Sequence, residues 1–332
     1  MNGPSLWILA LALTAPTWAA EPENLKGRIA LDLGAVAAPQ PPADLAGTAL
    51  APASPAKSLR ALRVTFISVG QGDSEYIELP GGENALVDGG PDAAPLAAFL
   101  ESQGITRINH VVLTHPHADH YNGLNYVFDR LQVDNFYDTR MDNAGAVGDE
   151  TVRAKAGREP GCVTHYPRPG ESLDWGPGVA VKVFNSCPDP VKSDPADRSS
   201  NAAVNDCSIV LKAAAEGLSV LLTGDAETGA EASMTAAFGP ELKADVLKVG
   251  HHGSARSSSA AFLQAVRPRW AVIEVGRNNY GHPTQNALAR LQEAGASVDR
   301  TDQDGTVATS DLLRNMLLTR LATHLSISGL DY

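Results

Sequence analysis

The densest group of side chains able to hold a metal ion lies between His115 and His120, in the sequence H-P-H-A-D-H. Three of the chain's nine histidines stand here beside Asp119. Pro116 excludes a regular helix, and in an extended segment His115, His117 and Asp119 point to one side. A turn at Asp119 then aims His120 at the same place. Imidazole together with carboxylate suits zinc, with manganese or iron as alternatives.

Asp88, Asp225 and the pair His251-His252 each follow an apolar run typical of a β-strand. A carboxylate at the end of a strand, such as Asp88, is well placed to accept a hydrogen bond from a ligand histidine. A single carboxylate such as Asp225 can bridge two divalent ions about 3.5–4 Å apart. Each aspartate taken alone is a weak signal, because aspartate is also common in plain turns.

Apolar runs and turn residues predict the elements that position these side chains. We expect strands at residues 64–69, 75–79, 85–87, 108–113, 179–184, 208–212, 219–222, 245–249 and 270–275, and helices at 93–101, 227–238, 258–266 and 284–294. The early strands resemble a meander, and the later strands alternate with helices. This pattern predicts an α/β fold in which two mixed sheets pack together with helices outside.

The order of these motifs resembles the metallo-β-lactamase superfamily. It runs from Asp88-Gly89-Gly90 through the histidine-rich segment to Gly224-Asp225 and a histidine at a strand end. The segment 69–73 (VGQGD), the segment 251–254 (HHGS) and the segment 281–283 (GHP) make the chain similar to the hydrolase domain of the ComEC competence-protein family. The resemblance covers residues 63–304.

The resemblance implies an αββα sandwich, built as a single large domain, with a metal site at the edges of the sheets. It also implies one or two zinc ions, with manganese as an alternative, and a hydroxide between the ions as the nucleophile. Seven side chains receive roles: His115 and His117 hold one ion, Asp119, His120 and His251 hold the other, Asp225 bridges both, and Asp88 supports a ligand from outside.

One ligand of the true β-lactamases is missing. They carry another metal-binding histidine between the H-x-H-x-D-H motif and the bridging aspartate, where this chain offers only His165 in a proline-rich stretch. The corresponding positions hold Asn205 to Ser208. This arrangement resembles the ComEC type and weakens the first metal site, so occupancy by one ion is more secure than by two.

Further polar residues are expected to meet an anionic substrate. We expect His252 and His282 to contact it or to protonate a leaving oxygen, which places them with Asp119 and Asp225 in the catalytic group. The expected substrate-binding residues are Asn205, Ser208, Ser254 and Lys248. Arg256 and Arg277 are further candidates to cradle one phosphodiester.

The composition narrows the classes of function. With 26 Lys and Arg against 38 Asp and Glu, the net charge is −12, and 43% of the 332 residues are hydrophobic. This is a globular composition, and its acidity argues against a protein that coats nucleic acid through a broad basic face. Cys162, Cys187 and Cys207 are too few for a disulfide scaffold, and the sequence leaves their three pairings open.

The chain divides into four predicted segments. Residues 1–20 have no charged side chain, an apolar run and small residues at Ala19 and Ala20, which predicts a signal peptide. Residues 21–60 form a Pro/Ala-rich linker, residues 61–310 the hydrolase domain, and residues 311–332 a tail with helix-like apolar spacing. We therefore expect a secreted or periplasmic bacterial protein without a membrane anchor once the signal is removed.

The leading hypothesis is a metal-dependent hydrolase of phosphate esters, a phosphodiesterase or nuclease of ComEC-like type that acts on single-stranded or short DNA. The resemblance connects such an enzyme with competence and DNA internalization. One alternative is hydrolysis of a small non-nucleic substrate, such as a phosphocholine ester, a lactone or a lactam. Another is a binding module without catalysis. The sequence does not fix the substrate or the oligomeric state.

Overall fold

The computed structural model describes residues 61–144, 146, 148–194 and 200–312. The predicted signal peptide, the predicted linker and the tail beyond residue 312 lie outside this range. Within these ranges, none of the helices combines the length and the apolar character needed to cross a membrane.

Two seven-stranded mixed sheets make up the centre of the domain. The first sheet has the order β16 (Val307–Ala308), β1 (Arg63–Phe66), β2 (Glu75–Glu78), β3 (Asn84–Val87), β4 (Arg107–Val112), β5 (Gln132–Tyr137) and β7 (Val163–His165). The second has the order β15 (Ser297–Arg300), β14 (Trp270–Ile273), β13 (Val246–Lys248), β12 (Leu218–Leu222), β11 (Val210–Ala215), β9 (Ala180–Asn185) and β8 (Ser172–Leu173). Two short strands, β6 (Met141–Asp142) and β10 (Val191–Lys192), pair in parallel beside them.

In each sheet, antiparallel pairs give way to a run of parallel strands. The parallel runs are β3-β4-β5-β7 in the first sheet and β12-β13-β14-β15 in the second. Parallel strands expose all their carboxyl ends at the same edge, where α/β proteins place their ligands. This topology therefore creates two facing rows of strand ends from which side chains can converge.

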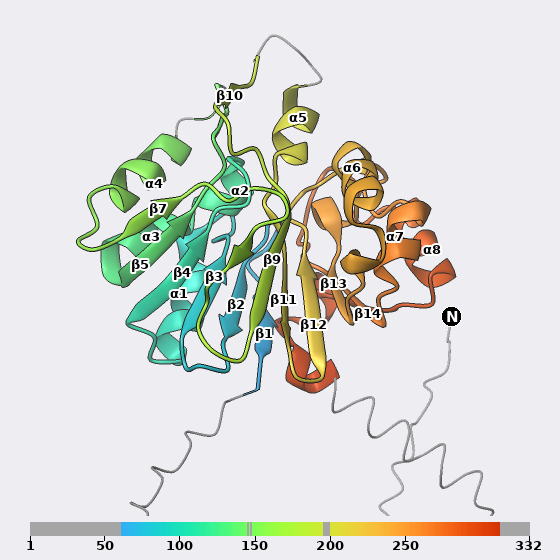
Figure 1. Cartoon of the computed structure of the whole chain (residues 1–332), viewed down its shortest axis with the longest axis horizontal. Coiled ribbons are helices and arrows are strands. Elements are labelled where there is room, and N and C mark those ends of the chain that lie inside the picture. The colour runs from blue at the N-terminus through green and yellow to red at the C-terminus, as the bar shows by residue number, and fades with distance from the viewer. Residues whose placement is uncertain (1–60, 145, 147, 195–199, 313–332) are drawn as a thin grey trace, which may run out of the picture. The chain divides into compact units, whose positions relative to one another are not determined.

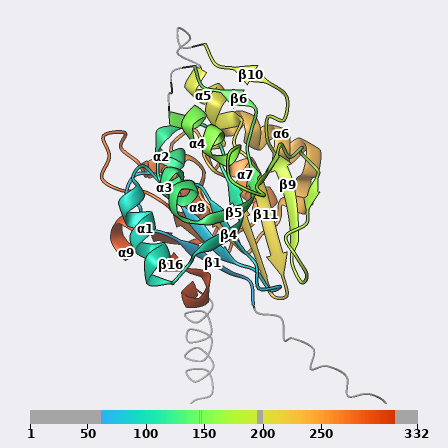
Figure 2. The same ribbon diagram turned by 90° about the vertical axis from the view of Figure 1, so that its left-hand side faces the viewer.

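Helices cover the outer face of each sheet (Figures 1 and 2). The first sheet carries α1 (Ala93–Ser102), α2 (Ala118–Tyr121), α3 (Leu124–Arg130) and α4 (Gly148–Ala156). The second carries α6 (Thr228–Phe238), α7 (Ala260–Val266) and α8 (Gln285–Glu293). Shorter elements are α5 (Ser200–Asp206), α9 (Thr301–Asp304) and two 3₁₀ turns, Gly239–Leu242 and Gly250–Gly253. The predicted αββα architecture is confirmed.

Three apolar clusters correspond to the interfaces of these four layers. The cluster between the sheets includes Phe66, Ile77, Val183 and Leu222, and also Leu312 at the end of the described range. The other two clusters lie between each sheet and its helices. Burial on this scale, at roughly 25 cal/mol per Å² of apolar surface, fixes the position of one sheet on the other.

Local sequence explains where the predicted helices begin. The Asp92 side chain accepts a hydrogen bond from the Ala94 amide at the start of α1, and Thr284 caps α8 in the same way through the Ala287 amide. Such caps satisfy amides that lack a partner inside the helix. Five helices, α2, α3, α4, α5 and α9 (Thr301–Asp304), were not predicted, because their segments are short and lack a regular apolar stripe.

A disulfide between Cys187 and Cys207 settles the cysteine pairing that the sequence left open, and Cys162 is a free thiol. The bridge joins the segment after β9 to the residue that follows α5, 20 positions later. Cys207 and its neighbour Val204 are buried in a small cluster with Met141. The bridge therefore anchors α5, which carries Asn205, against the rest of the domain.

We predict that Cys207→Ala lowers the free energy of unfolding by about 3 kcal/mol, because the disulfide restricts a loop of about this length in the unfolded chain. Urea unfolding with and without a reductant measures the difference. The matched control is Cys162→Ala, which removes a thiol without a bridge and is expected to respond to reductant as the wild type does. Equal stability of the Cys207→Ala and wild-type proteins under oxidising conditions would contradict this assignment.

Candidate metal centre

The histidine-rich segment lies just beyond β4, at the carboxyl edge of the first sheet. We expected this segment to be extended as far as a turn at Asp119. In the structure, α2 starts earlier, at Ala118, directly after Pro116 and His117. Asp119 and His120 therefore point from a helical turn, whereas His115 and His117 precede it. His115 Nε2 and His117 Nδ1 lie 2.9 Å apart, so these two rings face a common point.

Asp88 holds His120 in place from the end of β3. Its carboxylate lies 2.7 Å from His120 Nδ1 and accepts two further hydrogen bonds, from the Thr114 amide at 2.8 Å and the Thr114 hydroxyl at 2.6 Å. Asp88 is fully buried and has a left-handed backbone with φ of 55°. A carboxylate that fixes one ring nitrogen turns the other nitrogen outward as a ligand, which is the pattern around metal-binding histidines.

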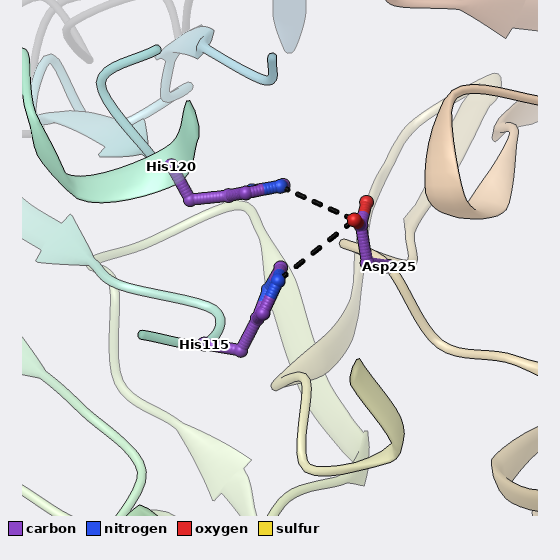
Figure 3. A group of neighbouring side chains, drawn as sticks. All are labelled: His115, His120 and Asp225. Atoms are coloured by element: carbon purple, nitrogen blue, oxygen red, sulfur yellow. Dashed lines mark ion pairs between the residues drawn. The ribbon is translucent and has the colours of Figure 1, made fainter. Parts of the chain in front are cut away.

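Asp225 reaches the same point from the second sheet, three residues after the end of β12 at Leu222 and directly after the turn at Gly224. Its Oδ2 lies 3.5 Å from His120 Nε2 and 3.8 Å from His115 Nε2 (Figure 3). The Asp225 amide donates to the Ser208 hydroxyl at 3.1 Å, which fixes the turn. Asp225 therefore connects ligands from two different sheets.

His252, rather than His251, completes the group around Asp119. Its Nε2 lies 3.4 Å from Asp119 Oδ2 and 3.6 Å from Asp225 Oδ1, while its Nδ1 donates to the Glu274 carbonyl at 2.9 Å. His252 is only 1% exposed. The motifs led us to expect His251 in this group and His252 at the substrate; the structure instead brings His252 to Asp119, because the chain turns between these two neighbours.

His251 faces the other oxygen of Asp225. Its Nε2 lies 3.7 Å from Asp225 Oδ2, the oxygen that His115 and His120 also approach. Glu227 accepts from His251 Nδ1 at 3.0 Å and from the side-chain Nδ2 of Asn205 at 3.0 Å. His251 thus lies on the same side of Asp225 as His115, next to the metal site that lacks the further histidine of the true β-lactamases. Glu227 fixes one ring nitrogen of His251, just as Asp88 fixes one ring nitrogen of His120.

The backbone around these histidines is unusual. His251 and His252 have φ angles of 48° and 52°, in the left-handed region that ordinary residues rarely adopt. Such conformations cost on the order of 1–3 kcal/mol each and persist where the surroundings impose them, most often at functional sites. Successive left-handed residues turn both rings toward Asp225, which a regular strand or helix cannot do.

The donor groups fit divalent cations. His120 Nε2, His252 Nε2 and Asp225 Oδ1 are buried and have no hydrogen-bond partner among the described residues. The nitrogen–oxygen pairs of the site are 3.4–3.9 Å apart, and tetrahedral ligands at zinc-like bond lengths lie about 3.4 Å from one another. One group combines His115, His120 and Asp225, and another Asp119, His120 and His252.

The electrostatics of the site also favour positive charge. Burial alone would lower the pKa of His120, yet the carboxylates of Asp225, Asp88 and Asp73 raise it well above its usual range. Burial likewise opposes charge on His252, but Asp225 and Asp73 raise its pKa to about 10. For His115, burial and the neighbouring rings of His120 and His117 lower the pKa well below the usual value. Divalent cations would satisfy the same demand for positive charge.

A polar cavity of about 530 Å³ opens above these groups. Of the expected substrate-binding residues, Asn205 and Ser254 line it, and so does His282. Ser208 and Lys248 do not, because both are fully buried. The expectation that Ser208 and Lys248 touch substrate is therefore wrong.

Lys248 lies beneath the centre instead. Its ammonium donates to the carboxylate of Asp73 and, at 2.8 Å, to the carbonyl of Gly224. Asp73 in turn lies 3.2 Å from His252 Nδ1. The segment 69–73 was quoted in the sequence analysis, but the role of its aspartate was missed, as were the roles of Glu227 and Glu274.

Gly72 explains why this segment needs glycine. A Cβ built on Gly72 would lie 2.3 Å from the Asp119 carbonyl oxygen, and the Asp73 amide donates to that oxygen at 3.3 Å. The segment therefore packs directly under the turn that carries Asp119, and a side chain at Gly72 would displace it.

We predict that Asp225→Asn and His252→Ala lose bound divalent metal, because each removes a donor that converges on the centre. Asp88→Asn should weaken metal affinity by roughly 10- to 100-fold, as expected for a residue that orients a ligand. Mass spectrometry of metal content and competition with a chelating dye provide the two measurements. His165→Ala is the control, because its ring packs on Tyr137 outside this site; full metal content in Asp225→Asn would contradict the assignment.

We predict that Lys248→Met lowers the free energy of unfolding by about 3–5 kcal/mol, because it leaves the Asp73 carboxylate buried without its cation. The double variant Asp73→Asn/Lys248→Met removes both charges and should recover part of this loss. Urea unfolding of the wild type, of the single variants Asp73→Asn and Lys248→Met, and of the double variant measures the coupling in a double-mutant cycle. Additive effects of the two substitutions would show that the ion pair does not couple them.

The chain is similar in sequence to a known family and to curated proteins. Residues 67–173 match the family model of the Metallo-beta-lactamase superfamily. The ComE operon protein 3 of Bacillus subtilis is 32% identical over 267 residues, which cover 74% of this chain and 32% of that protein. The Competence protein ComA of Neisseria gonorrhoeae is 30% identical over 246 residues, which cover 73% of this chain and 31% of that protein. The chain thus spans about a third of the length of these relatives.

Among solved structures, the metallo-beta-lactamase fold protein YhfI from Bacillus subtilis matches with a TM-score of 0.49 and 12% identity, over 75% of this chain and all of that one. The family model and the curated relatives confirm the resemblance inferred from the motifs. Residues 67–173 thus carry a Metallo-beta-lactamase superfamily domain, and over about three quarters of its length the chain is similar to ComE operon protein 3 and Competence protein ComA.

Proposed function

We propose that this domain hydrolyses phosphodiester bonds of single-stranded DNA, with zinc or manganese at the centre. The observation that carries the proposal is the position of the carboxylate–histidine groups at the floor of an open polar cavity with an anchored arginine at its rim. Bound divalent cations would lower the pKa of water and stabilise negative charge on a phosphate. The net charge of −12 argues for a local grip on the substrate rather than a coat along it.

Arg256 is the cation at the rim. Its Nε donates to Glu227 Oε2 at 2.8 Å, while its side chain remains 64% exposed. Glu227 therefore holds both His251 and Arg256, and all three side chains line the cavity. An arginine that is fixed at Nε keeps its terminal nitrogens available for a phosphate oxygen. Ser254 and Asn205 provide further hydrogen-bonding groups on the same cavity.

His282 lines the cavity as a neutral side chain. Burial, together with His251 and His252, lowers its pKa to about 4, and its Nδ1 has no hydrogen-bond partner among the described groups. A histidine that is neutral near pH 7 can hydrogen-bond a phosphate oxygen but is a poor proton donor. The structure thus favours substrate positioning by His282 over the protonation of a leaving oxygen.

Two further observations support the setting. One relative is named Competence protein ComA, and a third relative, the Recombination protein 2 of Haemophilus influenzae, is 43% identical over 90 residues that cover 27% of this chain and 11% of that protein. The Cys187–Cys207 disulfide suits an oxidising compartment, in agreement with the signal peptide predicted at residues 1–20. We accordingly propose that the domain acts on DNA outside the cytoplasm.

The test uses the protein loaded with zinc or manganese and offers four substrates: labelled single-stranded DNA, the same sequence as a duplex, bis(p-nitrophenyl) phosphate and the lactam nitrocefin. We predict cleavage of single-stranded DNA and of the small phosphodiester, with loss of more than about 100-fold in Asp225→Asn, since removal of one electrostatic group at a reacting centre costs about this much. Rates from gel and absorbance assays provide the measurement.

His165→Ala should retain the wild-type rate, and chelator should abolish activity. Cleavage of neither phosphodiester would sink the proposal, and efficient turnover of nitrocefin would favour the lactam alternative. Metal-loaded protein without any of these activities would favour a binding module.

A further inference from the structure

Tyr280 stands out among the described residues as a large aromatic side chain that is 74% exposed. It lies on the loop between β14 and α8, which also carries His282. The ring is not packed into either apolar layer, although burial of an aromatic side chain is strongly favourable. Its ring centroid lies 5.8 Å from that of His282, so an exposed aromatic face adjoins the catalytic cavity.

The loop presents this ring on a fixed backbone. The Asn278 side chain accepts hydrogen bonds from the amides of Tyr280 at 3.0 Å and His282 at 3.1 Å. It also donates to the carbonyls of Gly276 and His282, both at 2.9 Å. One asparagine thus closes four hydrogen bonds across the loop. A preorganised loop loses little conformational entropy when a ligand binds against it.

A second cavity, of about 590 Å³, is also lined by Tyr280. Its size is within the range of ordinary small-molecule sites, about 300–1,000 Å³. It shares Gln71, Ala118, Asp119 and Tyr280 with the catalytic cavity. The two cavities therefore meet at Asp119, a member of the metal-binding groups, with Tyr280 at their common edge.

The lining of the second cavity matches a nucleotide. Amide side chains from Gln71, Asn122 and Asn279 contribute donors and acceptors, and the exposed Arg277 adds a positive charge. Amides can pair with the edges of bases, and arginine can pair with a neighbouring phosphate. An aromatic face beside a cation is the combination with which proteins hold single-stranded nucleic acid without regard to sequence.

We propose that Tyr280 and the second cavity form a nucleotide subsite, in which a base next to the phosphate at the metal centre stacks on the Tyr280 ring. This inference rests on the proposed function, because it places the neighbouring phosphate over Asp119 and Asp225. A base must be unpaired to stack in this way. The subsite therefore selects single-stranded nucleic acid over duplex and over phosphodiesters that lack bases.

The test measures binding separately from cleavage. The probe is a short single-stranded oligonucleotide that contains 2-aminopurine, whose fluorescence falls on stacking, and phosphorothioate linkages that resist hydrolysis. With metal-loaded protein, we predict that Tyr280→Ala weakens binding by roughly 5- to 100-fold and removes the quenching. Tyr280→Trp should retain both, because the aromatic face remains.

A matched oligonucleotide with an abasic site in place of 2-aminopurine isolates the stacking contribution. The wild type and Tyr280→Ala should bind it equally, because no base is present to contact the ring. The control variant is Tyr166→Ala, which removes an exposed tyrosine that lines neither cavity and packs under Arg140. It should bind both probes as the wild type does.

The outcomes separate this inference from the proposed function. Equal binding of the 2-aminopurine probe by the wild type and Tyr280→Ala overturns the subsite, even where the wild type cleaves DNA. Absence of binding by the wild type overturns it as well. Tyr280-dependent binding by a protein that cleaves no phosphodiester supports the subsite and rejects the proposed activity.

Discussion

Five carboxyl groups lie almost without access to water at and beneath the facing edges of the two sheets, and the rest of the site depends on how their charge is offset. They belong to Asp73, Glu75, Asp88, Asp225 and Glu274. Lys248 offsets Asp73, and burial together with repulsion from nearby carboxylates, Asp73 among them, raises the pKa of Glu75 and Glu274, the latter to about 8, so this pair retains a proton. Asp225 has histidines around it instead, which makes it the point where a cation is most favourable.

The two sheets contribute complementary parts of this arrangement. The first provides Asp88 and the histidine-rich segment, and the second provides Asp225 and the two left-handed histidines. Neither set of side chains would be fixed without the apolar cluster between the sheets, which holds the two rows of strand ends opposite each other. The unfavourable backbone at Asp88, His251 and His252 is tolerated because packing and hydrogen bonds on every side determine it.

Much of this design could be predicted from the sequence, because it depends on local patterns. The ligand-dense segment, the aspartates at strand ends and most long strands and helices are visible as spacing and apolar runs. Other features depend on contacts between distant segments. From the sequence, Lys248 was expected to bind substrate. Its partner Asp73 lies 175 positions earlier in the chain, so only the tertiary structure shows this buried ion pair. His251 and His252 are adjacent in sequence, so only the left-handed turn shows which ring meets Asp119. The disulfide partner and the position of Tyr280 were equally dependent on tertiary structure.

Because ligands from both sheets converge on Asp225, a bound metal ion would affect the stability of the folded protein and its resistance to proteases. An ion held there would be bound by side chains from both sheets at once, so that metal binding and folding become thermodynamically linked. Loss of the ion would leave several buried charges without compensation and would favour local opening at the sheet edge, where proteases gain access to the chain. The supply of metal in the compartment would then set how long each folded molecule survives.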